Sequence, residues 1–423
     1  MTVAFLALFV ALLACNYWVL RSLLYPAALF AAIWTIAVAG AALAPFGFYA
    51  VSAEALTIFY MGALAFSCGG ACALLSTGVQ IENKGQAAAL RAGSRRRLDI
   101  TLFVVLCGLP LYLTRVSRLA EGAEVQTLFA TIRLASVSET NRGWEERIAE
   151  NFMLLALFLA LALFYENDGS RPRRLRVYAG VGLALVYGIL TAGKSTAVSL
   201  VLMMLAISWL RKGRAQVIPL VISVLAIVVT FTAGVVLVNW FGEIPNADWE
   251  GVTRVAEIWW NYGVGGLVAF SEILARPSDA GWTGGVYRPL LQIANALGGK
   301  VDVPFLHAEY QSISPHASTN VYTIYWLYVE DFGVVGSLLM MLGLGAVVTW
   351  LYLAARMGHV LAILFYAFAF TGSILTIHGE HFITGLTSYG KALVFWLLIY
   401  TPFWSRSNHS GASWSALPHT PEA

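Results

Sequence analysis

The sequence predicts an all-α polytopic membrane protein with about eleven transmembrane helices (ten to twelve) and one large external loop. Composition is the first reason: 59% of the 423 residues are hydrophobic, 12% are charged, and the mean hydropathy is +0.73. The second reason is a series of apolar runs long enough to cross a bilayer as helices. The third is that basic residues gather in alternate connections between these runs. Such a chain cannot stay soluble as a globular domain.

Residues 1–238 form the predicted N-terminal membrane region, with about eight spans. About 20 apolar residues in a helix cross roughly 30 Å of hydrocarbon. The runs 100–114 and 177–192 are short for a span, as is the C-terminal run 391–405, and this is the reason for the range of ten to twelve spans. The runs are 2–19, 24–43, 55–76, 100–114, 149–165, 177–192, 195–210 and 217–238.

Residues 239–332 form the predicted large external loop. Within it, the stretch from Trp259 to Leu274 is mildly apolar and begins with two tryptophans. It suits an interfacial helix whose aromatic rings lie at headgroup depth. About three C-terminal spans follow within 333–405, and the Ser/Pro-rich tail 406–423 is predicted to be disordered. The C-terminal runs are 333–354, 360–377 and 391–405.

The positions of the cations predict the orientation. If the spans alternate, one side of the membrane holds 15 of the 26 Lys and Arg residues but 5 of the 23 Asp and Glu residues. The positive-inside rule makes this side the cytoplasm. The N-terminus then lies outside and the C-terminus inside. Because no basic segment precedes the first run, we expect it to be a membrane helix and not a cleaved signal peptide.

A nucleotide-binding pattern occurs at Gly188-Ile-Leu-Thr-Ala-Gly193-Lys194-Ser195, which matches the P-loop consensus letter for letter. A P-loop requires a buried strand before it and a helix of a soluble βαβ layer after it, whereas both flanks here are membrane spans. The topology also places Lys194 outside, away from ATP. Two alternatives stay open for Lys194: its ammonium group binds a lipid phosphate, or its side chain only extends to the lipid headgroups.

Other chemical patterns are weaker. His378, Glu380 and His381 follow one another closely, but their spacing does not place three ligands on one helix face, and we predict no metal or other cofactor. No Gly-x-Ser-x-Gly elbow occurs. The spans contain few ionisable residues, which argues against a flippase or an ion-coupled transporter.

Several segments resemble a known family. Asn320-Val-Tyr-Thr-Ile-Tyr together with Asp331-Phe-Gly-Val-Val-Gly336 is similar to the segment by which bacterial O-antigen and exopolysaccharide repeat-unit polymerases of the Wzy type re-enter the membrane. His316 resembles a feature of the related O-antigen ligases. Further similar segments are Tyr25-Pro-Ala-Ala-Leu-Phe-Ala-Ala-Ile-Trp34 and Tyr262-Gly-Val-Gly-Gly-Leu-Val-Ala-Phe270.

The resemblance implies a GT-C-like fold and a metal-independent glycosyltransferase of the bacterial inner membrane. Such an enzyme transfers a growing glycan from undecaprenyl pyrophosphate to a hydroxyl of a new lipid-linked repeat unit at the periplasmic face. An O-antigen ligase, which uses a lipid A-core acceptor, is the alternative. The implied partners are the undecaprenyl-pyrophosphate-linked oligosaccharides, membrane lipids, a chain-length regulator and a flippase, with no nucleic acid.

The reaction requires cations for the departing pyrophosphate and a proton acceptor for the hydroxyl. Lys194 and Arg288 are the predicted phosphate contacts. The family usually has arginine in place of Lys194, and a lysine, unlike an arginine, cannot bind phosphate with two parallel hydrogen bonds. The base candidates are His316, Asp331 and Glu330. Asn320 and Tyr322 are assigned to sugar hydroxyls or to loop architecture, and Arg133 and Arg142 to further phosphate contacts.

Each assignment has a structural alternative. Arg288 could pair with Glu272 or Asp302. His316 could cap a helix beginning near Asn320, and Asp331 a helix beginning at Phe332. Tyr322 and its aromatic neighbours could form a groove wall, and Arg133 and Arg142 could belong to a solvated face. The sequence leaves these alternatives open.

Overall fold

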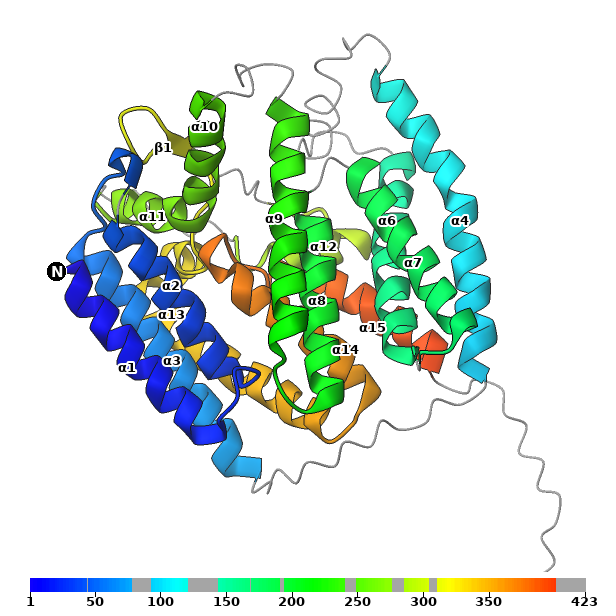
Figure 1. The fold of residues 1–423 in the computed structure, drawn as a ribbon, viewed down its shortest axis with the longest axis horizontal. Helices are drawn as coiled ribbons and strands as arrows, with labels where there is room; N and C mark the ends of the chain where they lie inside the picture. The colour runs from blue at the N-terminus through cyan, green and yellow to red at the C-terminus, as the bar shows by residue number, and fades with distance from the viewer. Residues whose placement is uncertain are drawn as a thin grey trace, which may run out of the picture.

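The computed structural model describes residues 1–43, 45–77, 93–120, 144–167, 169–190, 194–239, 249–275, 285–303 and 310–400. Most of these residues are helical (Figure 1). The elements are α1 (Thr2–Leu20), α2 (Pro26–Leu43), η1 (Pro45–Gly47), α3 (Ala53–Thr77), α4 (Gly93–Ala120), α6 (Trp144–Glu166), α7 (Arg171–Leu190), α8 (Lys194–Lys212), α9 (Val217–Asn239), α10 (Trp249–Trp260), η2 (Asn261–Gly265), α11 (Gly266–Leu274), α12 (Arg288–Ala296), β1 (Gln311–Ser312), β2 (Ser318–Thr319), α13 (Tyr325–Arg356), α14 (Val360–Ile374), η3 (Leu375–Ile377) and α15 (Leu386–Tyr400).

Each of the eleven predicted apolar runs overlaps a helix. In the described part of the chain, seven helices are long and apolar enough to cross a membrane: α1, α2, α3, α4, α8, α13 and α14. Three shorter apolar helices, within α6, α9 and α15, accompany them. The protein therefore has the architecture of a polytopic membrane protein. Eleven spans and a GT-C-like arrangement stay predictions.

Glycines allow the closest helix pair. The helices α3 and α13 share the most extensive interface in the structure. A Cβ atom at Gly69 would collide with the carbonyl oxygen of Leu342, and one at Gly345 with that of Phe66. Small residues at such positions let two backbones approach in a membrane protein. The same group includes α1 and α2, and α14 connects it to α8 and α15.

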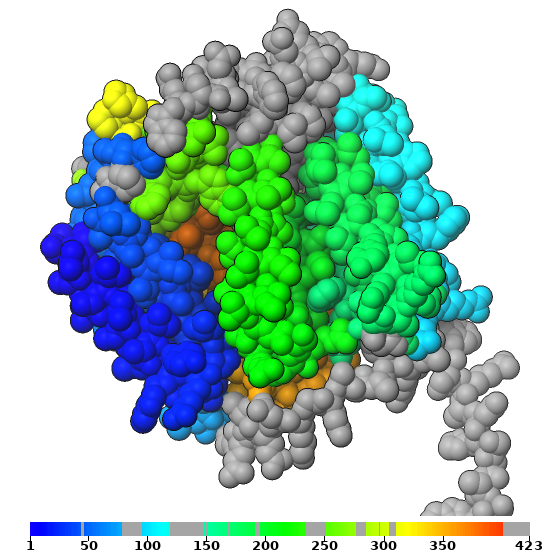
Figure 2. All heavy atoms as spheres, viewed as in Figure 1, coloured from blue at the N-terminus to red at the C-terminus, as the bar shows by residue number. Residues whose placement is uncertain are grey.

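The helix α9 lies at the front of the molecule in Figure 2, where orange residues of the α14 region are visible in a recess between α9 and the blue N-terminal helices. It packs mainly against α8. Its outer face is apolar and exposed, as expected for a surface that contacts lipid acyl chains. The exposed side chains include Val217, Ile218, Val221, Ile222, Leu225, Val228 and Val229.

Four of the arginines predicted to be cytoplasmic, Arg97, Arg176, Arg211 and Arg356, lie at one end of the bundle. Contacts between neighbouring helices join them there, since arginine side chains reach backbone or carboxylate oxygens of adjacent helix ends. The contacts are Arg97 Nη1 to Leu398 O (2.7 Å), Arg176 Nη2 to Asp99 Oδ2 (2.9 Å), Arg211 Nη2 to Asn167 O (2.9 Å) and Arg356 Nη1 to Gly213 O (3.3 Å). These four arginines therefore share one end of the bundle, and the assignment of this end to the cytoplasm stays a prediction.

The opposite end carries the predicted external segments. Here α10, a π-helical turn (η2) and α11 form one bent helical stretch (Figure 1). The predicted interfacial helix over Trp259–Leu274 is wrong in its second half, because the first six residues of α11 are buried against the bundle. Ser271 Oγ accepts a hydrogen bond from Ser52 N (2.8 Å). A Cβ at Gly266 would lie 2.7 Å from Ile377 O, so only glycine fits there.

The last external segment joins α13 earlier than the apolar run suggests. The run begins at residue 333, but α13 begins at Tyr325. Gly333 has φ 68° and ψ −179°, which separates a short helical stretch over 325–332 from the long helix that follows. Ile324 N donates to Thr376 O (2.8 Å), so the start of α13 is attached to η3, the short turn that follows α14.

Candidate functional site

Arg288 and Asp331 lie in one contact region at the outer end. Asp331 Oδ2 accepts a hydrogen bond from Val286 N (2.8 Å), and the rings of Tyr287 and Phe332 meet edge to face with centroids 5.8 Å apart. These contacts hold the turn that leads into α12, whose first residue is Arg288. The carboxylate of Asp331 thus binds this turn, and it precedes no new helix at Phe332.

Arg288 is half-buried, and burial lowers the pKa of its guanidinium. An arginine stays protonated at physiological pH because its unperturbed pKa exceeds 12. A cation that has lost part of its water interacts more strongly with an anion than an exposed one does. Arg288 is therefore suited to binding a phosphate group at this end of the bundle.

Three other predicted site residues, Glu330, Tyr322 and Asn320, lie near the start of α13. Glu330 is half-buried beside Asp331. Tyr322 is 3% exposed and lies against the ring of Trp326 with centroids 4.7 Å apart. Asn320 is half-buried in the extended segment before α13.

His316 lies on the turn of the small hairpin β1–β2, in which Gln311 is opposite Thr319. Its side chain is exposed, and its backbone N–H donates to Ser314 Oγ (3.2 Å). Because α13 begins at Tyr325, His316 does not cap it. Among the interactions of the described residues, none joins His316 to Asp331.

Three predicted phosphate contacts have side chains outside the described residues. Lys194 is the first residue of α8, but only its backbone is described. Arg133 and Arg142 lie outside the described ranges altogether.

Glu380 organises the connection between α14 and α15. Its Oε1 accepts hydrogen bonds from Tyr328 Oη (2.9 Å), Phe382 N (2.7 Å) and Ile383 N (2.8 Å), and its Oε2 accepts one from Thr384 N (2.6 Å). The side chain is 7% exposed. A buried carboxyl group with four hydrogen-bond donors fixes the backbone around it.

His378 and His381 flank this carboxylate. Burial, followed by the neighbouring His381, lowers the pKa of His378 to about 4. Burial also lowers the pKa of His381, against a smaller raising effect of Glu380. Both imidazoles are therefore neutral at pH 7, and a neutral imidazole can accept a proton.

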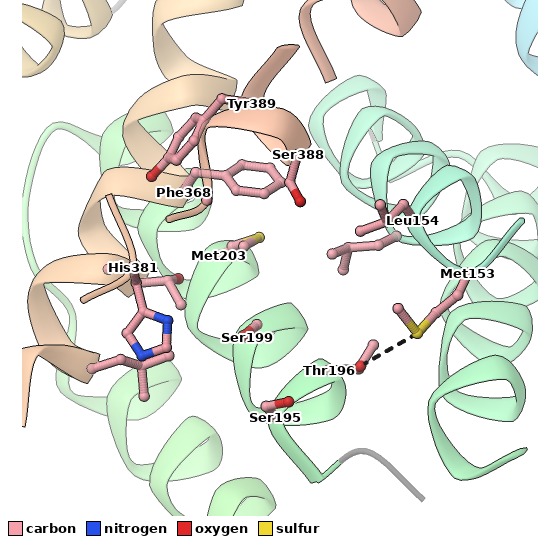
Figure 3. Close-up of a pocket in the computed structure, with 15 residues that line it drawn as sticks. Met153, Leu154, Ser195, Thr196, Ser199, Met203, Phe368, His381, Ser388 and Tyr389 are labelled. Atoms are coloured by element: carbon pink, nitrogen blue, oxygen red, sulfur yellow. Dashed lines mark hydrogen bonds between the residues drawn. The ribbon is translucent and has the colours of Figure 1, made fainter. Parts of the chain in front are cut away.

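A cavity of about 220 Å³ lies next to His381, between α6, α8, α14 and α15 (Figure 3). We call it the His381 cavity. Its lining combines apolar side chains, among them Met153, Leu154 and Phe368, with hydroxyl groups and the imidazole of His381. Thr196 Oγ1 lies 3.8 Å from Met153 Sδ across it (Figure 3). The hydroxyl-bearing residues are Ser195, Thr196, Ser199, Thr371, Ser388 and Tyr389.

The helix α15 links the cavity to Arg288. Ser388 and Tyr389, in the first turn of α15, line the cavity, and α12 packs against α15. Sequence reasoning considered His378, Glu380 and His381 only as metal ligands. One feature of the sequence could have identified them as candidate site residues. They follow an apolar run, in a connection predicted to lie on the same side of the membrane as the large loop.

No family model, curated protein or solved structure matches this chain.

Proposed function

We propose that this protein polymerises lipid-linked oligosaccharide repeat units at the periplasmic face of the bacterial inner membrane. The growing glycan leaves its undecaprenyl pyrophosphate carrier and joins a hydroxyl of a newly delivered repeat unit. The reaction uses no nucleotide, because the bond to the pyrophosphate carries the driving force. A flippase that delivers the units and a regulator of chain length are the expected partners.

The observation that carries this proposal is the half-buried Arg288 at the outer end, fixed through the Val286–Asp331 hydrogen bond. The reaction needs a cation at the membrane surface, since negative charge develops on the pyrophosphate as it departs. The guanidinium can contact two phosphate oxygens at once. As the first residue of α12 it also lies at the positive end of that helix.

A second requirement is that two lipid-tethered substrates meet in a fixed geometry. Two described outer segments pack onto the bundle, since the first six residues of α11 are buried and Ile324 N donates a hydrogen bond to Thr376 O. A rigid surface of this kind holds reacting groups together and lowers the entropic part of the barrier. This arrangement supports transfer chemistry more than it supports passage of a glycan through the spans.

The test uses purified protein in lipid vesicles with undecaprenyl-pyrophosphate-linked repeat units and no ATP. We expect polymer from the wild type. Arg288→Ala should lower the rate by roughly 10²–10³-fold, as removal of one donor to a developing oxyanion does. Arg288→Lys should recover part of the rate, because a point charge replaces the bidentate guanidinium.

Arg254 supplies the matched control. It lies in α10 at the same end, has a side chain that is 43% exposed and pairs with Glu257 at 2.7 Å. Arg254→Ala should leave the rate within about twofold, since exposed ion pairs contribute little. Equal effects of the two alanine substitutions would contradict the proposal. Product formed only on a lipid A-core acceptor would instead identify an O-antigen ligase, and a strict requirement for ATP would restore the P-loop interpretation.

A further inference from the structure

The His381 cavity contains polar groups that the protein itself does not satisfy. Thr371 is 3% exposed, and its Oγ1 has no hydrogen-bond partner among the described residues. Serine and threonine in helices commonly bond the carbonyl four residues earlier, and Ser373 does so with Ala369 O (2.8 Å). Thr371 instead lines the cavity. A buried hydroxyl without a partner costs free energy, so a polar guest in the cavity would stabilise it.

The size and charge of the cavity limit what this guest can be. Its volume of about 220 Å³ is below the roughly 300–1,000 Å³ of pockets for drug-sized ligands, so it can take one small group such as a sugar ring. None of the described lining residues is an arginine or a lysine. Neutral hydroxyls and one imidazole match a hydroxyl-bearing sugar better than a pyrophosphate.

The imidazole of His381 is held in a fixed loop beside the cavity. The four hydrogen bonds to Glu380 determine the path of the backbone on both sides of it. Gly379, which precedes Glu380, has φ 154°, a backbone conformation that residues with a side chain rarely adopt. A base with a fixed position and a neutral ring is ready to accept a proton at neutral pH.

We propose that the His381 cavity binds a sugar of the acceptor repeat unit and that His381 takes up the proton of its attacking hydroxyl. This inference rests on the proposed function and adds to it an acceptor site and a catalytic base. It replaces His316, Asp331 and Glu330 in the role of base, because none of these three lines the described cavity.

The transfer step balances without a further reactant. The acceptor oxygen forms a bond to the anomeric carbon of the donor glycan while its proton passes to a nitrogen of His381. The bond from that carbon to the pyrophosphate oxygen breaks, and the electron pair leaves with undecaprenyl pyrophosphate. Arg288, whose helix α12 packs on α15, then faces the charge that develops on the leaving group. The imidazolium afterwards releases its proton to water.

The first experiment compares two histidines in the vesicle assay. His381→Ala should lower the rate of polymer formation at least about 100-fold, as loss of a general base typically does. His359→Ala is the control, because His359 lies at the opposite end of the bundle, before α14. Added imidazole should restore part of the rate of His381→Ala, since a small base can enter the enlarged cavity. His381→Gln should stay inactive.

The outcomes separate this inference from the proposed function. If the wild type forms no polymer, the proposed function fails. If the wild type forms polymer and His381→Ala retains its rate, only the inference fails. A His381→Ala protein that is inactive, unrescued by imidazole and less heat-stable than the wild type would show a structural role and would also overturn the inference.

A second experiment fills the cavity. Ser199→Phe places a ring in it, whereas Val198→Phe adds the same ring on α8 at a residue that does not line it. We expect Ser199→Phe to raise the KM for the acceptor repeat unit at least tenfold, with little change for the donor, and Val198→Phe to leave both values near wild type. Equal effects of the two substitutions, or an effect confined to the donor, would contradict an acceptor site.

The pH profile supplies a third readout. The groups that face His381 are Glu380 and His378 in its own connection, Tyr328 of α13 through Glu380, and Tyr389 of α15 across the cavity. Because burial lowers the pKa of His381, the wild-type rate should decline only below the usual histidine pKa of about 6.5. His381→Ala rescued by imidazole should instead follow the pKa of free imidazole. Identical profiles for the two would overturn the assignment.

Discussion

Glu380 should be the most sensitive carboxylate in the described part of the chain. Its two oxygens receive four hydrogen bonds, two of which come from buried donors, Tyr328 Oη and Phe382 N. The donors Ile383 N and Thr384 N are partly buried and can turn to water. Glu380→Ala therefore leaves two buried donors without an acceptor.

The cost follows from these contacts. Each buried donor left without a partner costs about 1–3 kcal/mol, so Glu380→Ala should destabilise the protein by about 2–6 kcal/mol. Glu380→Gln keeps one oxygen for Tyr328, Phe382 and Ile383 but directs an NH₂ group at Thr384 N. It should cost about 1.5–3 kcal/mol, the value of one hydrogen bond to a charged group.

The assay is thermal and denaturant unfolding of the purified protein in detergent micelles, followed by tryptophan fluorescence. Glu54→Gln is the control, because Glu54 is exposed in the first turn of α3 and its charge near the helix start is worth less than about 1 kcal/mol. The expected order of stability is wild type, Glu54→Gln, Glu380→Gln and Glu380→Ala. If Glu380→Ala unfolds at the same midpoint as Glu54→Gln, the carboxylate does not hold this connection together.

Two further predictions concern the bundle. A topology reporter placed after Arg214 should report cytoplasm and one placed at Gly298 the periplasm, because the cations gather at one end; a cytoplasmic signal at Gly298 would remove the basis for an external site. Gly345→Ala should cost about 1–3 kcal/mol in the same unfolding assay, since its Cβ would collide with Phe66 O, whereas Gly343→Ala, with open space around it, should be neutral. Equal midpoints for the two alanine variants would show that α3 and α13 can move apart freely.

Much of the membrane architecture was predictable because it depends on local properties of the chain. An apolar run of about 20 residues forms a helix in a bilayer whatever its neighbours are, since backbone groups must bond within the segment. Each predicted run therefore overlaps a helix. The grouping of Arg97, Arg176, Arg211 and Arg356 at one end follows from the alternation of these helices, and the structure confirms it.

The candidate site was predictable only in part. Arg288 and Asp331 attracted attention as charged groups in the external segment, and the structure brings their regions together through Val286. His316 attracted attention for the same reason, but it lies exposed on a hairpin turn. The sequence shows that a charged side chain is present but does not show which other side chains lie next to it. It therefore could not distinguish Arg288 and Asp331 from the exposed His316.

By itself, the sequence determined that this is a helical membrane protein, which apolar runs overlap its helices and which of their ends are basic. Only the tertiary structure decided that α11 is buried, that Glu380 meets Tyr328, and that His381 shares a cavity with hydroxyls of α8, α14 and α15. The physical reason is the range of the interactions. The burial of an apolar run depends on the residues of that run. A cavity forms where helices distant in the sequence pack imperfectly, and no local sequence pattern predicts where this happens.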